Sequence, residues 1–159
     1  MTSVISTFLL LVGGAFSIQA ALPAVPADAM TALRTPTNIV LYSLEPWEEP
    51  TAKDETLHGV KILGQTKLDA KQAKTAIAAF EAAISEGSSD GPKYRCFDPR
   101  HALRVTANGQ TYDFLLCYAC RGMAVYQDRT VIVRVAVAGT PDALNALLTA
   151  AHIPLSKDK

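Results

Sequence analysis

The length and composition of the chain describe one small domain without a strong overall charge. Of its 159 residues, 49% are hydrophobic and 19% are charged, and 15 basic side chains balance 15 acidic ones. This balance excludes a bulk electrostatic attraction to nucleic acid or to a membrane surface, and the three cysteines suffice for one disulfide and one free thiol.

Residues 1–20 are expected to be a secretory signal peptide that is cleaved after Ala20. This segment carries no charged side chain, and its apolar run is short for a membrane-spanning helix, which needs about 20 residues. An uncleaved anchor is the alternative. Cleavage would leave a periplasmic or secreted protein without a stable membrane span, in which the Ala- and Pro-rich residues 21–36 are a tether and residues 37–156 form a single domain.

Two strands are predicted in the first part of this domain, at 37–44 and at 57–64. The loop between them, at 45–55, is acidic and holds Trp47, the only tryptophan of the chain. Such a loop is either a solvated surface or a recognition loop, because tryptophan beside charge is typical of binding hot spots.

A helix is predicted to follow the second strand. Asp69 and Gln72 have the spacing of a capping box at its start, and Gly87 is placed to end it. The helical period predicts a buried stripe of Ala73, Ile77, Phe80 and Ile84.

Asn108 and Gly109 stand between two β-rich runs, which predicts a hairpin with a two-residue type I′ turn. The resulting register places Arg104 opposite Asp113 on a face that we expect to be wet, where an exposed ion pair contributes roughly 0.2 to 1 kcal/mol. The other face is expected to lie in the core and carries Leu103, Val105, Tyr112, Phe114 and Leu116, with His101 at its edge.

The remaining elements complete the fold prediction. A short strand at 93–97 precedes the hairpin, strands at 125–126 and 130–137 follow it, and Thr140-Pro141-Asp142 begins a last helix. Together they predict an α+β protein, with an antiparallel sheet of about five to seven strands and two helices packed on one face.

Three segments of the chain resemble a family of small exported bacterial proteins of unknown function. They are residues 58–66, the Cys-Phe-Asp-Pro-Arg-His segment at 96–101, and the hydrophobic strand that closes on Cys-Tyr-Ala-Cys at 117–120. The similarity covers residues 55–155, and the Cys-Phe-x-Pro-Arg-His signature is its specific part. The chain departs from the family pattern at Ala102, where glycine is expected, and at Ala119, where an acidic residue is expected. The resemblance implies no catalytic residue.

A structural disulfide between Cys96 and Cys120 is the first interpretation of the cysteines, with Cys117 buried as a small apolar side chain. A bulge at Asp98-Pro99 would bring Cys96 onto the same face as Cys120. In a strand, residues three apart lie roughly 10 Å from each other, whereas the Cα atoms of a disulfide lie within about 7 Å. Cys117 and Cys120 can therefore be bonded only where the strand ends at Cys117 and the chain turns.

The second interpretation is a zinc site, and the third is thiol chemistry. Cys96, His101, Cys117 and Cys120 have the number and types of ligand that suit tetrahedral zinc, although export favours oxidation over thiolate coordination. No helix is predicted to begin at Cys117 and lower its pKa. A Gly-rich phosphate loop, a nucleophile elbow and a His-Glu-x-x-His motif are all missing from the sequence, which favours a role other than catalysis.

Four residues are expected to bind a partner: Trp47, Arg100, His101 and Arg121. Arginine suits a bidentate contact to carboxylate or phosphate, and Arg100 is the residue expected to make it. The expected function is a binding or inhibitor-like interaction module that recognises another protein or a small anionic ligand. The alternative is a zinc- or thiol-dependent enzyme of the cell envelope; without zinc, no cofactor is expected.

Overall fold

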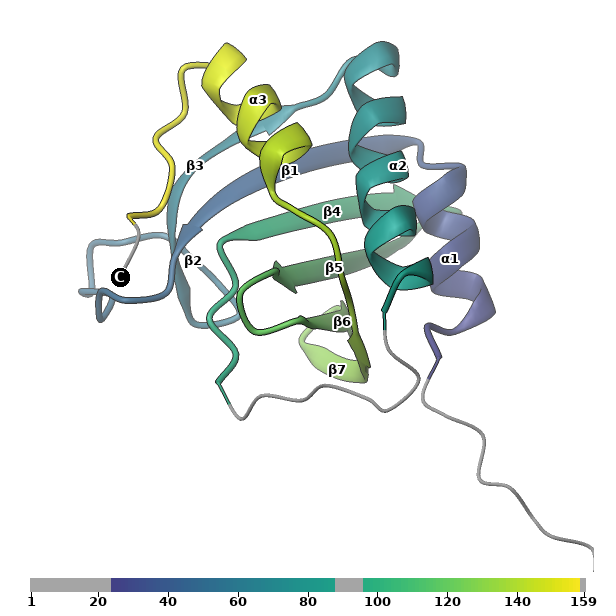
Figure 1. The fold of residues 1–159 in the computed structure, drawn as a ribbon, viewed down its shortest axis with the longest axis horizontal. Helices are drawn as coiled ribbons and strands as arrows, with labels where there is room; N and C mark the ends of the chain where they lie inside the picture. The colour runs from purple at the N-terminus through teal and green to yellow at the C-terminus, as the bar shows by residue number, and fades with distance from the viewer. Residues whose placement is uncertain (1–23, 88–95, 158–159) are drawn as a thin grey trace, which may run out of the picture.

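The computed structural model describes residues 24–87 and 96–157. The predicted signal peptide and residues 93–95 of the predicted short strand lie outside the described residues. The elements follow the order shown in Figure 1: α1 (Ala27–Arg34), β1 (Asn38–Glu45), β2 (Thr56–Leu57), β3 (Val60–Lys67), α2 (Ala70–Ser85), β4 (His101–Ala107), β5 (Gln110–Cys117), β6 (Gly122–Gln127), β7 (Thr130–Ala136) and α3 (Asp142–Ala150).

The seven strands form one curled antiparallel sheet in the order β2-β3-β1-β4-β5-β6-β7 (Figure 1). Every neighbouring pair in this order is antiparallel. The predicted α+β class and antiparallel sheet are therefore confirmed. The described residues contain three helices, one more than the sequence predicted.

The predicted hairpin is present with the predicted register. Asn108 and Gly109 form the turn with φ values of 52° and 76°, the positive values that a type I′ turn requires. Arg104 faces Asp113 and Leu103 faces Phe114 across β4 and β5. The turn therefore sets which side chains of both strands enter the core.

The local signals at the helix starts are also confirmed. The Asp69 carboxylate accepts from the backbone N–H groups of Lys71 and Gln72, and the Gln72 side chain accepts from the N–H of Asp69, so the capping box is complete. The last helix, α3, begins at Asp142, directly after Pro141. The capping box satisfies N–H groups that the start of α2 leaves open. At the start of α3, Pro141 is the N-cap residue and makes no side-chain cap hydrogen bond.

The predicted tether at 21–36 is wrong over α1. Residues 27–34 form a helix, in which Ala29, Ala32 and Leu33 are buried in the main core. Alanine has the highest helix propensity, and the segment gains an apolar contact with the sheet that its composition did not indicate. The folded domain therefore begins before residue 37.

Two strand predictions are also corrected. Residues 57–64 are not one strand, because His58 and Gly59 have φ values of 50° and 84° and form the turn between β2 and β3. In the predicted strand at 93–97, the described residues Cys96 and Phe97 belong to no regular element. Pro99 follows two residues later and has no N–H for a strand ladder, and β4 begins only at His101.

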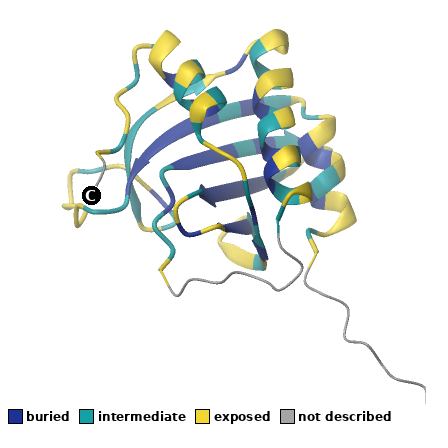
Figure 2. Ribbon diagram, in the orientation of Figure 1, coloured by how far each residue is buried: buried dark blue, intermediate teal, exposed yellow. Residues whose placement is uncertain are grey.

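Buried residues follow the inner strands of the sheet (Figure 2). The hydrophobic ones among them form two clusters. The larger one joins buried residues of all three helices with alternate residues of the strands, among them Leu103, Phe114 and Leu116. The smaller one contains residues of the other parity, Ala102 and Leu115, with side chains of β1 and β2. In the described parts of the chain, no helix combines the length and the apolar character needed to span a membrane.

Candidate ligand cavity and cysteine cluster

A cavity of about 290 Å³ lies where the hairpin, the Trp47 loop, α3 and the C-terminal segment meet. Its lining residues are Trp47, Asp98, Arg100, His101, Cys117, Tyr118, Ala119, Pro141, Asn145, Leu155 and Ser156. Three of the four predicted binding residues, Trp47, Arg100 and His101, thus come together from two distant parts of the sequence.

Backbone hydrogen bonds fix the Pro-Arg-His segment against the sheet. The N–H of Arg100 donates to the carbonyl oxygen of Leu116 at 3.3 Å, and its own carbonyl oxygen accepts from the N–H of Leu44 at 3.0 Å. His101 then continues as the first residue of β4, opposite Leu116. Arg100 is therefore held between β5 on one side and β1 on the other, which fixes the backbone position of Arg100 and His101.

His101 is a neutral, buried histidine at pH 7. Its Nε2 lies 2.8 Å from Oδ1 of Asn145 in α3, and because an amide oxygen can only accept, Nε2 carries the proton. Burial lowers the pKa of His101 to about 4, and the charge of Arg100 acts in the same direction, against the opposing effect of the Asn145 hydrogen bond. Arg100 thus places a positive charge near this ring.

A buried carboxylate connects the Trp47 loop to the C-terminal segment. Glu45 is only 2% exposed. Its carboxylate accepts from the N–H of Trp47 at 3.1 Å, from Ser156 Oγ at 3.3 Å and from the N–H of Lys157 at 3.3 Å. These bonds place two walls of the cavity, Trp47 and Ser156, relative to each other.

The acidic loop is partly neutralised by Lys61. The Lys61 ammonium lies 2.9 Å from Glu48 and 3.6 Å from Asp54. A second, smaller hollow of about 200 Å³ lies beside this loop and shares Trp47 and Asp98 with the main cavity. One end of the main cavity therefore borders an acidic surface.

The disulfide differs from the predicted one. It joins Cys117 to Cys120, whose Cα atoms lie 5.2 Å apart, and not Cys96 to Cys120. The condition for this bond is met, because β5 ends at Cys117 and the chain turns before Arg121, which has a φ of 49°. A turn brings the two Cα atoms within disulfide range, as a continued strand could not.

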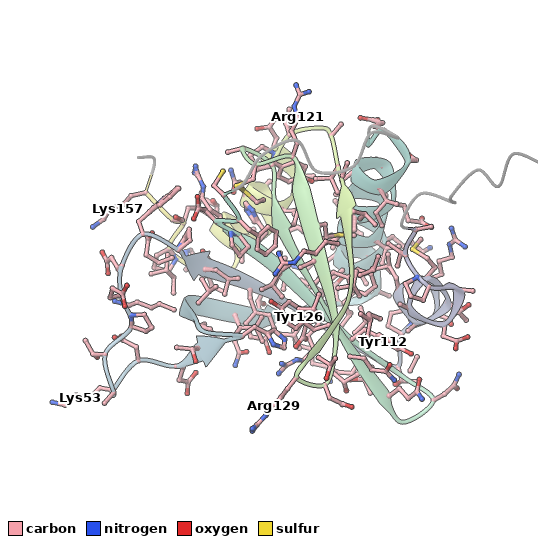
Figure 3. The ribbon with its side chains drawn as sticks, turned by 90° about the horizontal axis from the view of Figure 1, so that it is seen from below. Lys53, Tyr112, Arg121, Tyr126, Arg129 and Lys157 are labelled. Atoms are coloured by element: carbon pink, nitrogen blue, oxygen red, sulfur yellow. A yellow bond between two sulfur atoms is a disulfide. The ribbon has the colours of Figure 1, made fainter. Side chains whose placement is uncertain are left out.

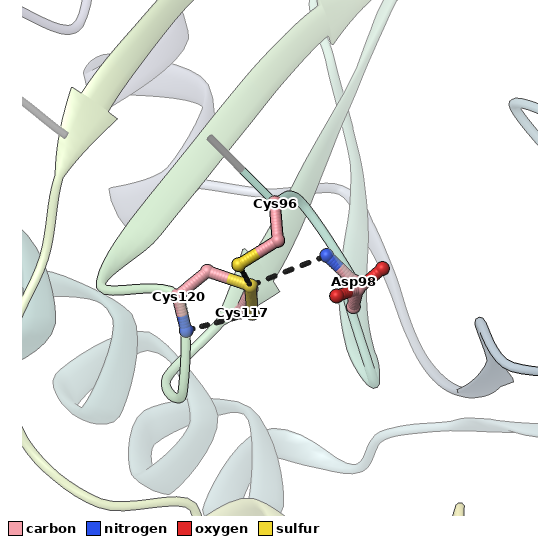
Figure 4. The surroundings of a disulfide bond; sticks show 4 residues. All are labelled: Cys96, Asp98, Cys117 and Cys120. Carbon is pink, nitrogen blue, oxygen red and sulfur yellow. Dashed lines mark hydrogen bonds between the residues drawn. A yellow bond between two sulfur atoms is a disulfide. The ribbon is translucent and has the colours of Figure 1, made fainter. Parts of the chain in front are cut away.

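Cys96 is an exposed thiol in contact with this disulfide (Figure 4). Its Sγ lies 3.5 Å from the Sγ of Cys120. The N–H of Asp98 donates to Cys120 Sγ at 3.3 Å, and the N–H of Cys120 donates to Cys117 Sγ at 3.0 Å. The three sulfurs therefore form one cluster, at the edge of the cavity that Cys117 lines.

The predicted set of zinc ligands comes together only in part. Within the described ranges, the donors that could share a metal ion are Cys96, Asp98 and Cys120, whose ligand atoms all lie within 4.8 Å of one another. His101 and Cys117 are not members of this group, and the sulfur of Cys120 is held in the disulfide.

Arg121, the fourth predicted binding residue, lies apart from the cavity. It is exposed, is not among the lining residues, and points away from the body of the protein in Figure 3. Its backbone has a structural role, because its N–H donates to Tyr118 and its carbonyl oxygen accepts from Val137. The structure thus separates Arg121 from Arg100.

The Arg104–Asp113 pair is not the exposed ion pair that the sequence predicted. Asp113 is 2% exposed and accepts two hydrogen bonds of 2.7 Å from Arg104. Its Oδ2 also lies 2.7 Å from Nε2 of His58, whose ring stacks on Tyr126 with centroids 3.7 Å apart. Arg104 and Asp113 lie on the face of the sheet opposite to His101, so the two histidines do not form an acid–base pair.

Sequence reasoning missed several lining residues. Asn145 follows the buried Leu144 on α3. Asparagine has a low helix propensity, so its presence inside a helix could have indicated a side-chain hydrogen bond. Tyr118 contacts the His101 ring edge-on, with centroids 6.3 Å apart. Leu155 and Ser156 carry no comparable signal, since only tertiary contacts bring the C-terminal segment to the cavity.

A scan against protein-family models, a search of the curated proteins and a search of the solved structures each found no match.

Proposed function

We propose that this chain is an exported binding protein whose cavity takes a small ligand with one carboxylate or phosphate group and an apolar part. The observation that carries the proposal is the meeting of Trp47, Arg100 and His101 in one cavity. A concave site with apolar walls and a few convergent polar groups is the usual form of a small-molecule site.

Each part of the cavity has a role in this proposal. Arg100 binds the anionic group through its guanidinium, which is always protonated and matches a carboxylate or phosphate in two hydrogen bonds. His101 is neutral at pH 7 and adds no second charge. Trp47, Tyr118 and Leu155 provide apolar surface for the rest of the ligand.

The size and the charge of the cavity limit the ligand. A volume of about 290 Å³ lies just below the usual range for ligand sites, roughly 300 to 1,000 Å³, and favours a molecule built on a single ring. Asp98 also lines the cavity and repels a second anionic group. A ligand with a single anionic group is therefore the preferred class.

We infer export from the predicted signal peptide at 1–20, and the Cys117–Cys120 disulfide is compatible with an oxidising compartment. We also propose that α2 and α3 cover the same face of the sheet, as the sequence predicted. Residues of both helices belong to the larger hydrophobic cluster, which supports this arrangement. It would make α3 a fixed wall that carries Asn145.

Fluorescence of Trp47 tests the proposal, because it is the only tryptophan and lines the cavity. Benzoate and phenyl phosphate are titrated into the purified protein, with benzyl alcohol as the neutral analogue. We expect saturable changes with the anions and at least tenfold weaker binding of the alcohol. A charged hydrogen bond contributes about 1.5 to 3 kcal/mol, so Arg100→Ala should weaken anion binding by about 10- to 100-fold.

Arg121→Ala is the matched control, because it removes the same side chain outside the cavity. Its affinity for both anions should equal that of the natural chain. Equal losses in the two variants, or no loss with Arg100→Ala while its melting temperature is unchanged, would contradict an anion site at Arg100.

A zinc-dependent role is the second candidate, favoured by the approach of Cys96, Asp98 and Cys120. Two sulfurs and one carboxylate oxygen leave a fourth position for water, as in catalytic zinc sites. Zinc would bind only after reduction of the Cys117–Cys120 disulfide. Reduced protein should then hold one zinc ion per chain, and Asp98→Asn should lower that content; less than a tenth of an ion per chain would exclude this role.

A further inference from the structure

We propose that Cys96, Cys117 and Cys120 form a thiol–disulfide exchange site, in which Cys120 alternates between bonds to Cys117 and to Cys96. The contact of 3.5 Å between the Sγ atoms of Cys96 and Cys120 carries the proposal (Figure 4). Cys96 is exposed, so its thiol can lose a proton to solvent and become the nucleophile. This activity is separate from ligand binding and does not depend on it.

The step conserves electrons and needs no oxidant or reductant. The Cys96 thiol gives its proton to solvent, and the thiolate attacks the Sγ of Cys120. The new bond joins Cys96 to Cys120, while the bond between Cys120 and Cys117 breaks and leaves its electron pair on Cys117. Cys117 departs as a thiolate that then takes a proton, so one disulfide and one thiol are present before and after.

The surroundings favour Cys117 as the leaving group. The N–H of Cys120 already donates to Cys117 Sγ at 3.0 Å, and a donor aimed at sulfur stabilises the charge that develops there. The N–H of Asp98 donates to Cys120 Sγ at 3.3 Å and holds the central sulfur. Both donors belong to backbone, so neither has to be recruited during the step.

The exchange changes the chemistry of the cavity. Cys117 lines the cavity, whereas Cys96 does not. In the Cys117–Cys120 form the free thiol lies on the surface, and in the Cys96–Cys120 form it lies in the cavity that Arg100 also lines. The same three residues therefore determine whether the cavity contains a reactive sulfur.

Disulfide mapping of the oxidised full chain tests the proposal. Folded protein is held at pH 8, quenched in acid and digested with pepsin at acid pH, where protonated thiols do not exchange, and the linked peptides are identified by mass spectrometry. We expect both linkages, Cys117–Cys120 and Cys96–Cys120, with the minor one at more than a few per cent of the total. Detection of Cys117–Cys120 alone after prolonged incubation would overturn the proposal.

Two variants make the assignment of the central sulfur decisive. Cys117→Ser oxidised in air should form a Cys96–Cys120 bond, and two remaining thiols would contradict the proposal. Cys120→Ser removes the shared sulfur and should leave Cys96 and Cys117 as free thiols. A Cys96–Cys117 bond in that variant would show that Cys120 is not the required partner. Disulfide mapping of these variants reads out the linkages alone and requires no bound anion, so the two proposals can fail independently.

Discussion

Nε2 of His58 lies 2.7 Å from Oδ2 of Asp113, and the same carboxylate accepts two hydrogen bonds from Arg104. His58 comes from the turn between β2 and β3, at one edge of the sheet, whereas Asp113 lies in β5. The side chains of His58 and Asp113 are 9% and 2% exposed, so their contact is almost completely shielded from solvent. One carboxylate thus connects the edge hairpin to an inner strand.

Replacement of Asp113 should destabilise the fold. Asp113→Asn keeps the shape but removes the charge that balances Arg104, and we expect a loss of roughly 2 to 3 kcal/mol in the free energy of unfolding, measured with urea. The loss is smaller than for a fully buried pair, because the Arg104 side chain is 36% exposed. Asp128→Asn, the same change on an exposed turn, is the control and should alter stability by less than about 0.5 kcal/mol.

The buried His101 should make stability depend on pH. An unfolded histidine binds a proton below about pH 6.5, whereas burial lowers the pKa of folded His101 to about 4. Stability is therefore fully present above pH 6.5 and is lost as pH falls towards 4, by about 3 kcal/mol. Urea unfolding between pH 7 and pH 4 measures this loss.

His101→Gln should remove most of the pH-dependent loss, because glutamine can still donate to Asn145 but does not titrate. His152→Gln is the control, since His152 is exposed, and its pH profile should match that of the natural chain. An unchanged profile in His101→Gln would assign the pH dependence to other groups.

Local sequence signals predicted the parts of the fold that short-range geometry determines. Asn108 and Gly109 set the hairpin register because few residues accept positive φ, and Asp69 with Gln72 set the start of α2 because they satisfy its open N–H groups. The approach of Arg100 and His101 to Cys117 follows from that register. These features need only neighbours in sequence or across one turn.

Long-range contacts account for what the sequence did not predict. Helix α1 has no side-chain cap, so the sequence contains no local signal for its start. The helix is recognised only from the packing of residues such as Leu33 in the larger hydrophobic cluster. Asp113 appeared exposed because its second partner, His58, is 55 residues away in sequence. The cavity itself depends on Asn145 and on the C-terminal segment, which tertiary packing alone brings to the Pro-Arg-His segment.

Gly109 should be the more sensitive residue of the hairpin turn. Its φ is 76° and no atom lies within 4 Å of an added Cβ, so Gly109→Ala meets backbone strain but no steric overlap. We expect a loss of about 1 kcal/mol in the free energy of unfolding. Asn108→Gly relaxes a φ of 52° and should change stability by less than about 0.5 kcal/mol. Equal losses in the two variants would contradict the turn geometry.

The two disulfide linkages should stabilise the fold to different extents, because they close loops of different length. In the chain-entropy model, a bond across a sequence separation of 3, as in Cys117–Cys120, contributes about 2 kcal/mol. A bond across the separation of 24 between Cys96 and Cys120 contributes about 3.5 kcal/mol. Cys96→Ser can form only the Cys117–Cys120 bond, which closes the shorter loop. Cys117→Ser should form the Cys96–Cys120 bond, which closes the longer one.

Reduction should therefore lower the melting temperature of Cys117→Ser more than that of Cys96→Ser, by roughly 5 °C for a domain of this size. Calorimetry of each variant with and without a phosphine reductant measures the difference. Cys120→Ser has no disulfide, so its melting temperature should not respond to the reductant. A smaller response of Cys117→Ser than of Cys96→Ser would mean that strain in the longer linkage outweighs the stability that its loop entropy contributes. Cys96 would then attack Cys120 only transiently and would not remain bonded to it.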